Sequence, residues 1–333
     1  MKKIYLIISI LLIILMVRYL NYNTHNENKD DNIFTVNTVE DKTVIKVISD
    51  LSVNKKEYTF PLYLTVDKRV YYKNDEKVYI EELNGSDDIY ITDNYLISLK
   101  DNSVYIYYRN GEALVLVDKL ENCACLDSSA YDNLVVLYEN NQCVLYDLIY
   151  DNGQYNRIDN LININDIKSV GLYDKTAFIL TNTNKVYGYG VDLVNARNEH
   201  REENILYEID TENVGEIVDF ACKGGVFVKN ISGQWFSANC YSTNYGCINP
   251  EPLKFNLIEG IENHLAVIGC ENLGFGYPVL SLDINGQIYS WGTYVGVDTN
   301  GKYILEDRHP VAQNIFVGIN KKIFIDGYNI YLV

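Results

Sequence analysis

The residues of this sequence that are best suited to metal or redox chemistry are seven cysteines and four histidines. The histidines are scattered, at His25, His200, His264 and His309, and no Cys-x-x-Cys pair occurs, so no zinc site is predicted. Cys240 and Cys247 bracket the short segment CYSTNYGC and are the candidate disulfide pair if the chain is exported. The odd number of cysteines leaves at least one free thiol. We expect no metal and no bound cofactor.

Catalytic motifs give no stronger signal. No G-x-S-x-G segment occurs, and no histidine stands in a recognisable catalytic motif. Gly188 and Gly190 follow a predicted strand, but no helix follows them to bind a phosphate. The paired carboxylates of a glycoside hydrolase are brought together by the fold and not by sequence spacing, so that class stays open. We therefore predict no catalytic residue and a protein that is not an enzyme, with a carbohydrate-active protein as the alternative.

Composition narrows the possible partners. The chain has 333 residues, of which 47% are apolar, and 30 tyrosines against 10 phenylalanines and two tryptophans. Tyrosine favours strands, so this excess indicates β-structure; a tyrosine-lined surface for sugars is the alternative. Residues 32–333 hold 24 of the 28 basic and 42 of the 45 acidic side chains, a net charge of −18. That charge repels nucleic acid and anionic membranes, whereas a basic protein partner or a neutral glycan is compatible with it.

The first 20 residues are typical of a targeting segment. Lys2 and Lys3 precede an apolar run from Ile4 to Val17, and no small-x-small cleavage site follows it. We predict an uncleaved signal anchor that contacts the membrane through residues 4–20, with a cleaved signal peptide and secretion as the alternative. Residues 21–32 are predicted to be a polar linker. Residues 33–333 would then form an extracytoplasmic domain on a bacterial-type envelope.

Downstream of the linker the sequence predicts short β-strands that repeat. The segments NKVYGYGVD, GQWFSANCY and GQIYSWGTY share a turn, an aromatic strand, a small residue and a polar continuation. A second shared element precedes them and recurs at Gly171, Cys222, Cys270 and Gly318, at intervals of 51, 48 and 48 residues. Such a period, filled with four short strands, indicates a β-propeller. Weaker matches near Cys125, Ile91 and Thr65 continue the series upstream.

We therefore predict an all-β propeller of seven blades, with six as the alternative. The chain ends inside the predicted strand NIYLV, so the last blade lacks an outer strand. We expect an N-terminal strand within residues 34–50 to pair there and close the ring. Closure would remove the exposed sheet edges that promote aggregation.

The segment GQIYSWG, the strand ahead of it and the period near 50 residues resemble the regulator of chromosome condensation repeat family. The match is strongest over residues 270–301, and the resemblance covers roughly residues 160–333. The family's loop glycines and the asparagine after Trp-Gly are mostly missing here. The resemblance implies a propeller used as a rigid binding platform, in a family that includes guanine-nucleotide exchange factors and a secreted β-lactamase inhibitor. We carry over the architecture and the binding role, and not the partner.

Two sets of residues follow from this architecture. Tyr187, Trp235 and Trp291 are predicted to share one register and to pack between neighbouring blades. The segments after the three matched hairpins, about 191–204, 238–250 and 293–309, are predicted to be long loops on one face of the ring. Exposed Tyr, Arg and His side chains in such loops are candidate contacts for a protein partner; here they are Arg197, His200, Tyr241, Tyr245, Tyr294 and His309.

Overall fold

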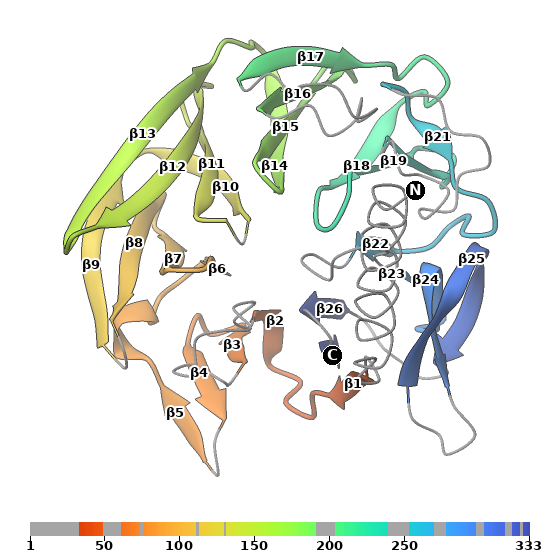
Figure 1. The fold of residues 1–333 in the computed structure, drawn as a ribbon, viewed down its shortest axis with the longest axis horizontal. Coiled ribbons are helices and arrows are strands. Elements are labelled where there is room, and N and C mark those ends of the chain that lie inside the picture. The colour runs from red at the N-terminus through yellow and green to blue at the C-terminus, as the bar shows by residue number, and fades with distance from the viewer. Residues whose placement is uncertain are drawn as a thin grey trace, which may run out of the picture.

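The computed structural model describes residues 33–48, 61–73, 76–110, 113–129, 131–190, 204–238, 253–269, 278–297, 303–316, 322–326 and 329–333. Within these residues it has 27 β-strands and one short 3-10 helix, η1 (Glu81–Leu83). The sheets are arranged as a ring around a central axis (Figure 1), so the prediction of an all-β propeller is confirmed. The predicted anchor and linker, residues 1–32, lie outside the described residues. No helix in the described part of the chain is long and apolar enough to cross a membrane.

The first three blades are four-stranded antiparallel sheets whose strands follow one another in the sequence from the axis outward (Figure 1). Blade 1 consists of β2 (Val44–Ile48), β3 (Leu62–Thr65), β4 (Val70–Lys73) and β5 (Lys77–Tyr79). Blade 2 consists of β6 (Asp88–Ile91), β7 (Tyr95–Lys100), β8 (Ser103–Asn110) and β9 (Ala113–Leu120). Blade 3 consists of β10 (Cys123–Ser128), β11 (Asn133–Tyr138), β12 (Cys143–Asp151) and β13 (Gln154–Ile162).

The next three blades repeat this order. Blade 4 consists of β14 (Ile167–Tyr173), β15 (Thr176–Thr181), β16 (Val186–Gly190) and β17 (Ile205–Ile209). Blade 5 consists of β18 (Ile217–Ala221), β19 (Phe227–Asn230), β20 (Trp235–Ser237) and β21 (Asn256–Leu257). Blade 6 consists of β22 (Ala266–Gly269), β23 (Pro278–Leu282), β24 (Ile288–Val297) and β25 (Tyr303–Phe316).

A smaller group of three strands lies beside blade 6. β26 (Ile323–Asp326) pairs antiparallel with β27 (Asn329–Leu332), and β27 pairs in parallel with β1 (Ile33–Thr38). β1 also pairs with β25, so the group shares a sheet with blade 6. The structure therefore has six four-stranded blades, and the preferred prediction of seven is wrong. The repeat signal at Gly318 precedes a two-stranded hairpin, β26 and β27, whose third neighbour is β1.

Apolar clusters fill the space between neighbouring blades. One cluster joins Leu64 of blade 1 to Ile89 of blade 2, and the next joins Ile97 of blade 2 to Val136 of blade 3. Similar clusters lie between blades 3 and 4 and between blades 4 and 5. Tyr331 of β27 packs with residues of blade 1 in the same way. Each blade is thus buried on both faces, which accounts for the nearly continuous apolar pattern of the second strands, such as β15.

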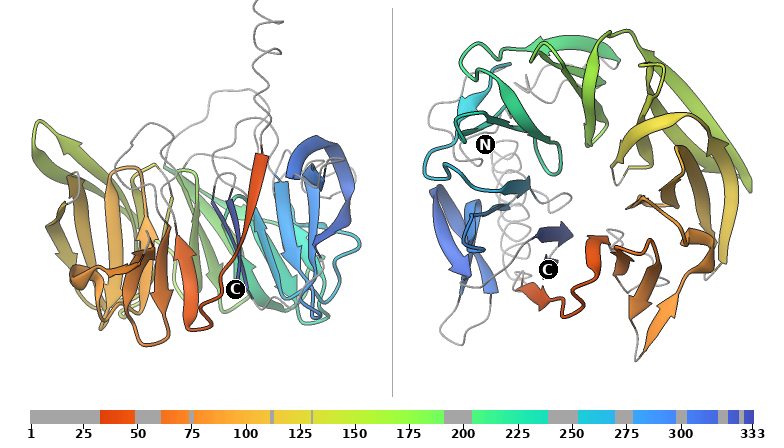
Figure 2. Two further views of the ribbon diagram at one scale, coloured as in Figure 1. Left: turned by 90° about the horizontal axis from the view of Figure 1, so that it is seen from below. Right: turned by 180° about the vertical axis from the view of Figure 1, so that it is seen from behind.

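The two ends of the ring carry different connections, and we name them accordingly (Figure 2, left). The loop end carries the first-to-second and third-to-fourth strand connections of each blade, such as residues 129–132 and 152–153 of blade 3. The turn end carries the second-to-third turns and the connections between blades, such as residues 139–142 and 163–166. β1 begins at the loop end, where Phe34 pairs with Tyr303, and runs to the turn end, where Val39 N donates to Leu332 O at 2.8 Å.

Candidate functional site

The third-to-fourth strand connections at the loop end differ in length around the ring. In blades 1 to 3 they are short: residues 74–76, 111–112 and 152–153. In blades 4 and 5 they are residues 191–204 and 238–255, and in blade 6 the strands themselves continue, to Val297 in β24 and from Tyr303 in β25. Because blades 4 to 6 are consecutive, the strand ends that these connections join lie next to one another at one end of the ring. The face that the three segments would form stays a prediction.

Most of the predicted contact residues cannot be placed. Arg197, His200, Tyr241 and Tyr245 lie outside the described residues, and so does the candidate disulfide pair, Cys240 and Cys247. The backbones of Tyr294 and His309 are described, and both lie in strands: Tyr294 pairs with Glu306 and His309 with Gly292. Their role as partner contacts stays a prediction.

The predicted loop 293–309 is therefore wrong over most of its length. β24 continues to Val297 and β25 begins at Tyr303, so the segment is mainly a long hairpin. His309-Pro310 lies within β25, although proline lacks the N–H that a strand ladder needs. The structure accommodates it next to register shifts on either side of Gly292, where pairing is interrupted.

The three aromatic residues predicted to share a register do not share it. Counted from the preceding turn, Trp235 is the first residue of its strand, Tyr187 the second and Trp291 the fourth. Trp235 and Trp291 are nevertheless both buried, and they lie in one apolar cluster with Phe227 of blade 5 and Val279 of blade 6. Tyr187 is only half-buried. The two tryptophans thus meet across one blade interface, with different strand positions filling the same space.

The inner strands of blades 1 to 3 bring charged side chains together in the central channel. Lys46 Nζ lies 2.6 Å from Asp88 Oδ1 and 3.6 Å from the centre of the Tyr90 ring. Tyr90 Oη lies 2.7 Å from Asp88 Oδ2 and 2.9 Å from the Leu126 carbonyl oxygen. The Lys46 and Asp88 side chains keep 23% and 30% of their exposure, so water reaches the pair through the channel. These contacts link three consecutive blades at the axis.

Burial dominates the electrostatics of this cluster. Burial lowers the pKa of Lys46, although Asp88 acts in the opposite direction. Burial also raises the pKa of Tyr90 well above its ordinary value, which keeps its hydroxyl protonated as a hydrogen-bond donor. An ammonium that is paired with a carboxylate and covered by an aromatic ring is held in one position. The cluster therefore has the properties of a structural contact between the inner strands, and not those of a free acid or base.

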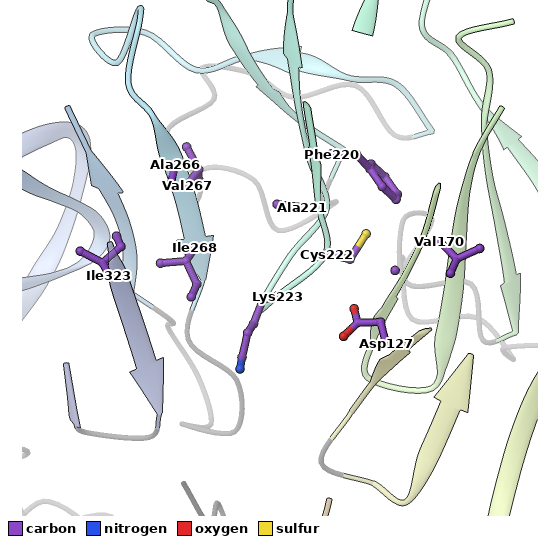
Figure 3. Close-up of a pocket in the computed structure, with 11 residues that line it drawn as sticks. Asp127, Val170, Phe220, Ala221, Cys222, Lys223, Ala266, Val267, Ile268 and Ile323 are labelled. Carbon is purple, nitrogen blue, oxygen red and sulfur yellow. The ribbon is translucent and has the colours of Figure 1, made fainter. Parts of the chain in front are cut away.

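A cavity of about 300 Å³ opens in the channel beyond this cluster. Asp127 and Lys223 stand on opposite walls, and the remaining lining is mostly apolar, including Phe220 and Ile268 (Figure 3). Asp127 Oδ2 accepts a hydrogen bond of 2.9 Å from the Leu172 N–H. Burial raises the pKa of Asp127, and the ammonium groups of Lys46 and Lys223 partly offset that effect. The charged walls come from the ends of β10 and β18 nearest the loop end, so the cavity lies beneath that end.

The chemistry available to this site is binding. Its volume admits a small molecule or one side chain of a partner. Among the described residues, no group of three or more His, Cys, Asp and Glu side chains could hold a metal ion. Burial raises the pKa of the thiols of Cys123 and Cys143 to about 11 and about 12, so both stay protonated at neutral pH.

Sequence reasoning missed the channel residues Lys46, Asp88, Tyr90, Asp127 and Lys223. They come from four separate parts of the chain, since Asp88 and Tyr90 share β6, and only ring formation brings these parts together. The one available signal was a charged residue within an otherwise apolar first strand, as in IKVI and ACLDS. Assigning those strands to the innermost position would have placed these side chains at the axis.

Comparison with known proteins supports the architecture. No protein-family model and no curated protein sequence matches this chain. Prp20p from Saccharomyces cerevisiae, a structure described with its binding to Gsp1p and histones, superposes with a TM-score of 0.57 at 14% identity over 77% of this chain and 75% of that chain. Yeast RCC1 (Prp20) bound to Kap60 gives 0.60 at 13% identity over 80% and 76%. The chain folds as an RCC1-like β-propeller.

A third comparison extends beyond yeast. Human WBSCR16 superposes with a TM-score of 0.56 at 12% identity, over 79% of this chain and 81% of that chain. At identities of 12 to 14% these likenesses concern the fold alone. They agree with the resemblance that GQIYSWG and the period near 50 residues indicated, and they transfer no partner to this propeller.

Proposed function

We propose that this protein is a non-catalytic binding module that presents the loop end of an RCC1-like propeller to a protein partner. The observation that carries the proposal is the confinement of the extended third-to-fourth strand connections to the consecutive blades 4, 5 and 6. A rigid scaffold with long connections gathered on one side is the usual arrangement of a recognition surface. Binding of Gsp1p, histones and Kap60 by the yeast protein of the same fold is consistent with a protein partner.

We further propose that the domain is extracytoplasmic and held at the membrane by residues 4–20. The direction of β1 supports a definite orientation for such an anchored domain. Because Ile33 lies at the loop end, the preceding linker leaves the ring from that end. Twelve linker residues extend over at most about 40 Å. The partner at the loop end is then a membrane protein or another protein within that distance of the bilayer.

β1 also supports the proposed closure of the ring. It bonds in parallel to β27 over four residue pairs and to the tip of β25 through Ile33 and Phe34. Removal of β1 would expose the edge of β27. We expect a chain truncated before Val39 to unfold at lower denaturant concentration than the full chain; equal stability would contradict the closure.

Capture of the partner tests the proposed function. Full-length protein would be cross-linked in intact membranes and purified through an affinity tag. The triple variant Tyr241→Ala, Tyr245→Ala and Tyr294→Ala should lose the captured protein while its unfolding transition is unchanged. A matched control replaces exposed apolar residues of β9 at the rim of blade 2, Val115→Ser and Leu116→Ser. Equal capture by the triple variant and the wild type would refute the assignment to the loop end.

Carbohydrate binding is the second candidate, and one observation favours it. A polar cavity of about 280 Å³ lies between blades 3 and 4 at the loop end, lined by Tyr131, Asp132, Asn133 and Asp147 among others. Tyr131 keeps 48% exposure, as an aromatic platform for a sugar ring would. Asp132 Oδ1 accepts a hydrogen bond of 2.8 Å from the Asn94 N–H, and Asp147 accepts from the Asn133 amide, so these carboxylates suit binding more than catalysis.

A glycan array separates the two candidates. Binding of a neutral glycan that Tyr131→Ala abolishes, with the triple tyrosine variant still active, would favour the carbohydrate function. Loss of partner capture in the triple variant with no glycan bound by the wild type would favour the protein-binding function.

A further inference from the structure

The opposite, turn end of the ring carries an unexpected set of apolar side chains. Among the described residues, the three most exposed large apolar side chains are Ile284, Ile231 and Val66, at 67%, 66% and 62%. Each directly follows the residue whose side chain accepts a hydrogen bond across a second-to-third strand turn, namely Asp283 in blade 6, Asn230 in blade 5 and Thr65 in blade 1. The same position holds Glu139 in blade 3 and Asn182 in blade 4. The apolar residues are therefore confined to one side of the ring.

The turns do not need these side chains for their own stability. In blade 5 the Asn230 N–H donates to Gln234 O at 2.9 Å, and Asn230 Oδ1 accepts from the Gln234 N–H at 2.9 Å. In blade 6 Asp283 makes the same two contacts with Gln287, at 2.9 and 2.8 Å. The buried Asn or Asp fixes the turn, while the isoleucine that follows it faces water. A polar residue would serve there equally well, as it does in blades 3 and 4.

Backbone contacts join two of these turns into one surface. The Asn263 N–H donates to Gly233 O at 2.9 Å, which brings the turn of Ile231 against the segment leading into blade 6. Two residues later, the Leu265 N–H donates to Leu282 O at 2.6 Å, so Leu265 lies beside the turn of Ile284. Leu265 is itself 48% exposed. We name Ile231, Leu265 and Ile284 the turn-end patch.

The patch is held on a rigid base. Trp235 Nε1 and Lys229 Nζ both donate to the His264 carbonyl, at 3.0 and 2.7 Å, and His264 Nδ1 lies 2.7 Å from Ser281 Oγ. These buried contacts fix the backbone immediately before Leu265. A preordered apolar surface loses little conformational entropy when a partner covers it.

Acidic side chains lie on the segments next to the patch and limit what can cover it. The Ile231 N–H donates to Glu216 O at 2.9 Å, which places Glu216 next to Ile231. Exposed carboxylates also lie on the connections into blades 5 and 6, at Glu212, Glu259 and Glu262. The nearby ammonium of Lys229 is directed inward, to the His264 carbonyl. A second copy of this chain would bring the same carboxylates to the interface, and an anionic bilayer would be repelled.

We propose that the turn-end patch binds a basic segment of a second protein, one that alternates Lys or Arg with large apolar side chains. Its apolar side chains would cover Ile231, Leu265 and Ile284, and its cations would face the surrounding glutamates. This site lies on the opposite end of the ring from the proposed loop-end surface, and neither depends on the other.

Peptide binding to the full-length protein tests the proposal. The probe is a fluorescein-labelled peptide of alternating Lys and Leu, and the controls are peptides of alternating Lys and Ser and of alternating Glu and Leu. Anisotropy titrations at 0.15 M salt should show saturable binding of the Lys-Leu peptide alone. The double variant Ile231→Ser and Ile284→Ser should weaken that binding at least about tenfold, while Glu216→Gln with Glu262→Gln should reduce its dependence on salt.

Two matched variants make the outcome decisive. Val115→Ser with Leu116→Ser, at another exposed apolar site on blade 2, should leave peptide affinity unchanged, as should the triple tyrosine variant of the loop end. Unchanged affinity in the Ile231 and Ile284 double variant, or an equal loss in the blade 2 control, would overturn the proposal. A loss confined to the triple tyrosine variant would also overturn it, because the peptide would then bind at the loop end.

Discussion

Replacing Gly171 by alanine should destabilise the contact between the inner strands of blades 4 and 5. A Cβ atom at position 171 would lie 2.5 Å from Cys222 Sγ and 2.6 Å from Cys222 Cβ. The sulfur could rotate away, but Cys222 Cβ is fixed to the backbone, so the two strands would have to separate. Overpacking of this kind costs about 1–3 kcal/mol. For a domain of about 300 residues this cost lowers the melting temperature by about 2–5 °C.

A double-mutant cycle isolates this contact. Cys222→Gly removes both atoms that an alanine at 171 would meet, so Gly171→Ala should be much less damaging in that background. Gly188→Ala is the matched control in the same blade. Its Cβ would lie 2.3 Å from the tip of the Tyr207 ring, which can turn aside, so its effect should be less than half as large. Urea unfolding, followed by tryptophan fluorescence, measures the free energy of unfolding of the wild type, the two single variants, the double variant and the Gly188→Ala control. Strictly additive effects of Gly171→Ala and Cys222→Gly would refute the reasoning.

Two further predictions concern pH and charge. Burial raises the pKa of tyrosines in each of blades 1 to 3. Their contribution to stability is therefore complete below their ordinary pKa near 10 and is lost as the pH rises above it. Phenolate absorbance and loss of β-structure should rise together in a pH titration, and two separate transitions would contradict this. The tyrosines concerned include Tyr71, Tyr90, Tyr95, Tyr146 and Tyr155. The Lys77 ammonium and the Thr43 hydroxyl hold the pKa of Asp41 well below its usual range. That carboxylate stabilises the fold above about pH 4, and this stabilisation is lost as the pH falls below that value. Asp41→Asn should lower the free energy of unfolding by about 1–2 kcal/mol at pH 7 and make it less dependent on pH in the acid range.

The repeated strand pattern could be predicted from the sequence because it depends on local periodicity. Turn pairs, aromatic strands and a spacing near 50 residues are visible along the chain, and they were sufficient to predict the propeller. The number of blades could not be predicted from local sequence patterns. Gly318 carries the same signal as Gly171, but the segment after it forms a hairpin that pairs with β1, some 290 residues earlier in the chain.

The channel cluster and the turn-end patch were out of reach for a different reason. Lys46 meets Asp88 and Tyr90 only because β2 and β6 are both innermost strands. Ile231 and Ile284 are single apolar residues within polar turns. The sequence alone does not distinguish them from apolar residues whose side chains point into the core. Their significance depends on the buried Asn230 and Asp283 side chains, which fix the turns without them.

If residues 4–20 anchor the domain as proposed, the direction of β1 gives the two ends of the ring different access to partners. A domain tethered through residue 33 has its loop end toward the membrane, because the chain enters the ring there. A loop-end partner must then fit between the ring and the bilayer or belong to the bilayer itself. The turn end points away from the tether, and a soluble basic protein can reach it without obstruction. Each blade reaches from the loop end to the turn end and packs against its neighbours on both faces. A partner bound at one end therefore need not disturb the other end. An anchored propeller with these two surfaces would hold a soluble protein beside a membrane-bound one, a role that needs no catalytic residue.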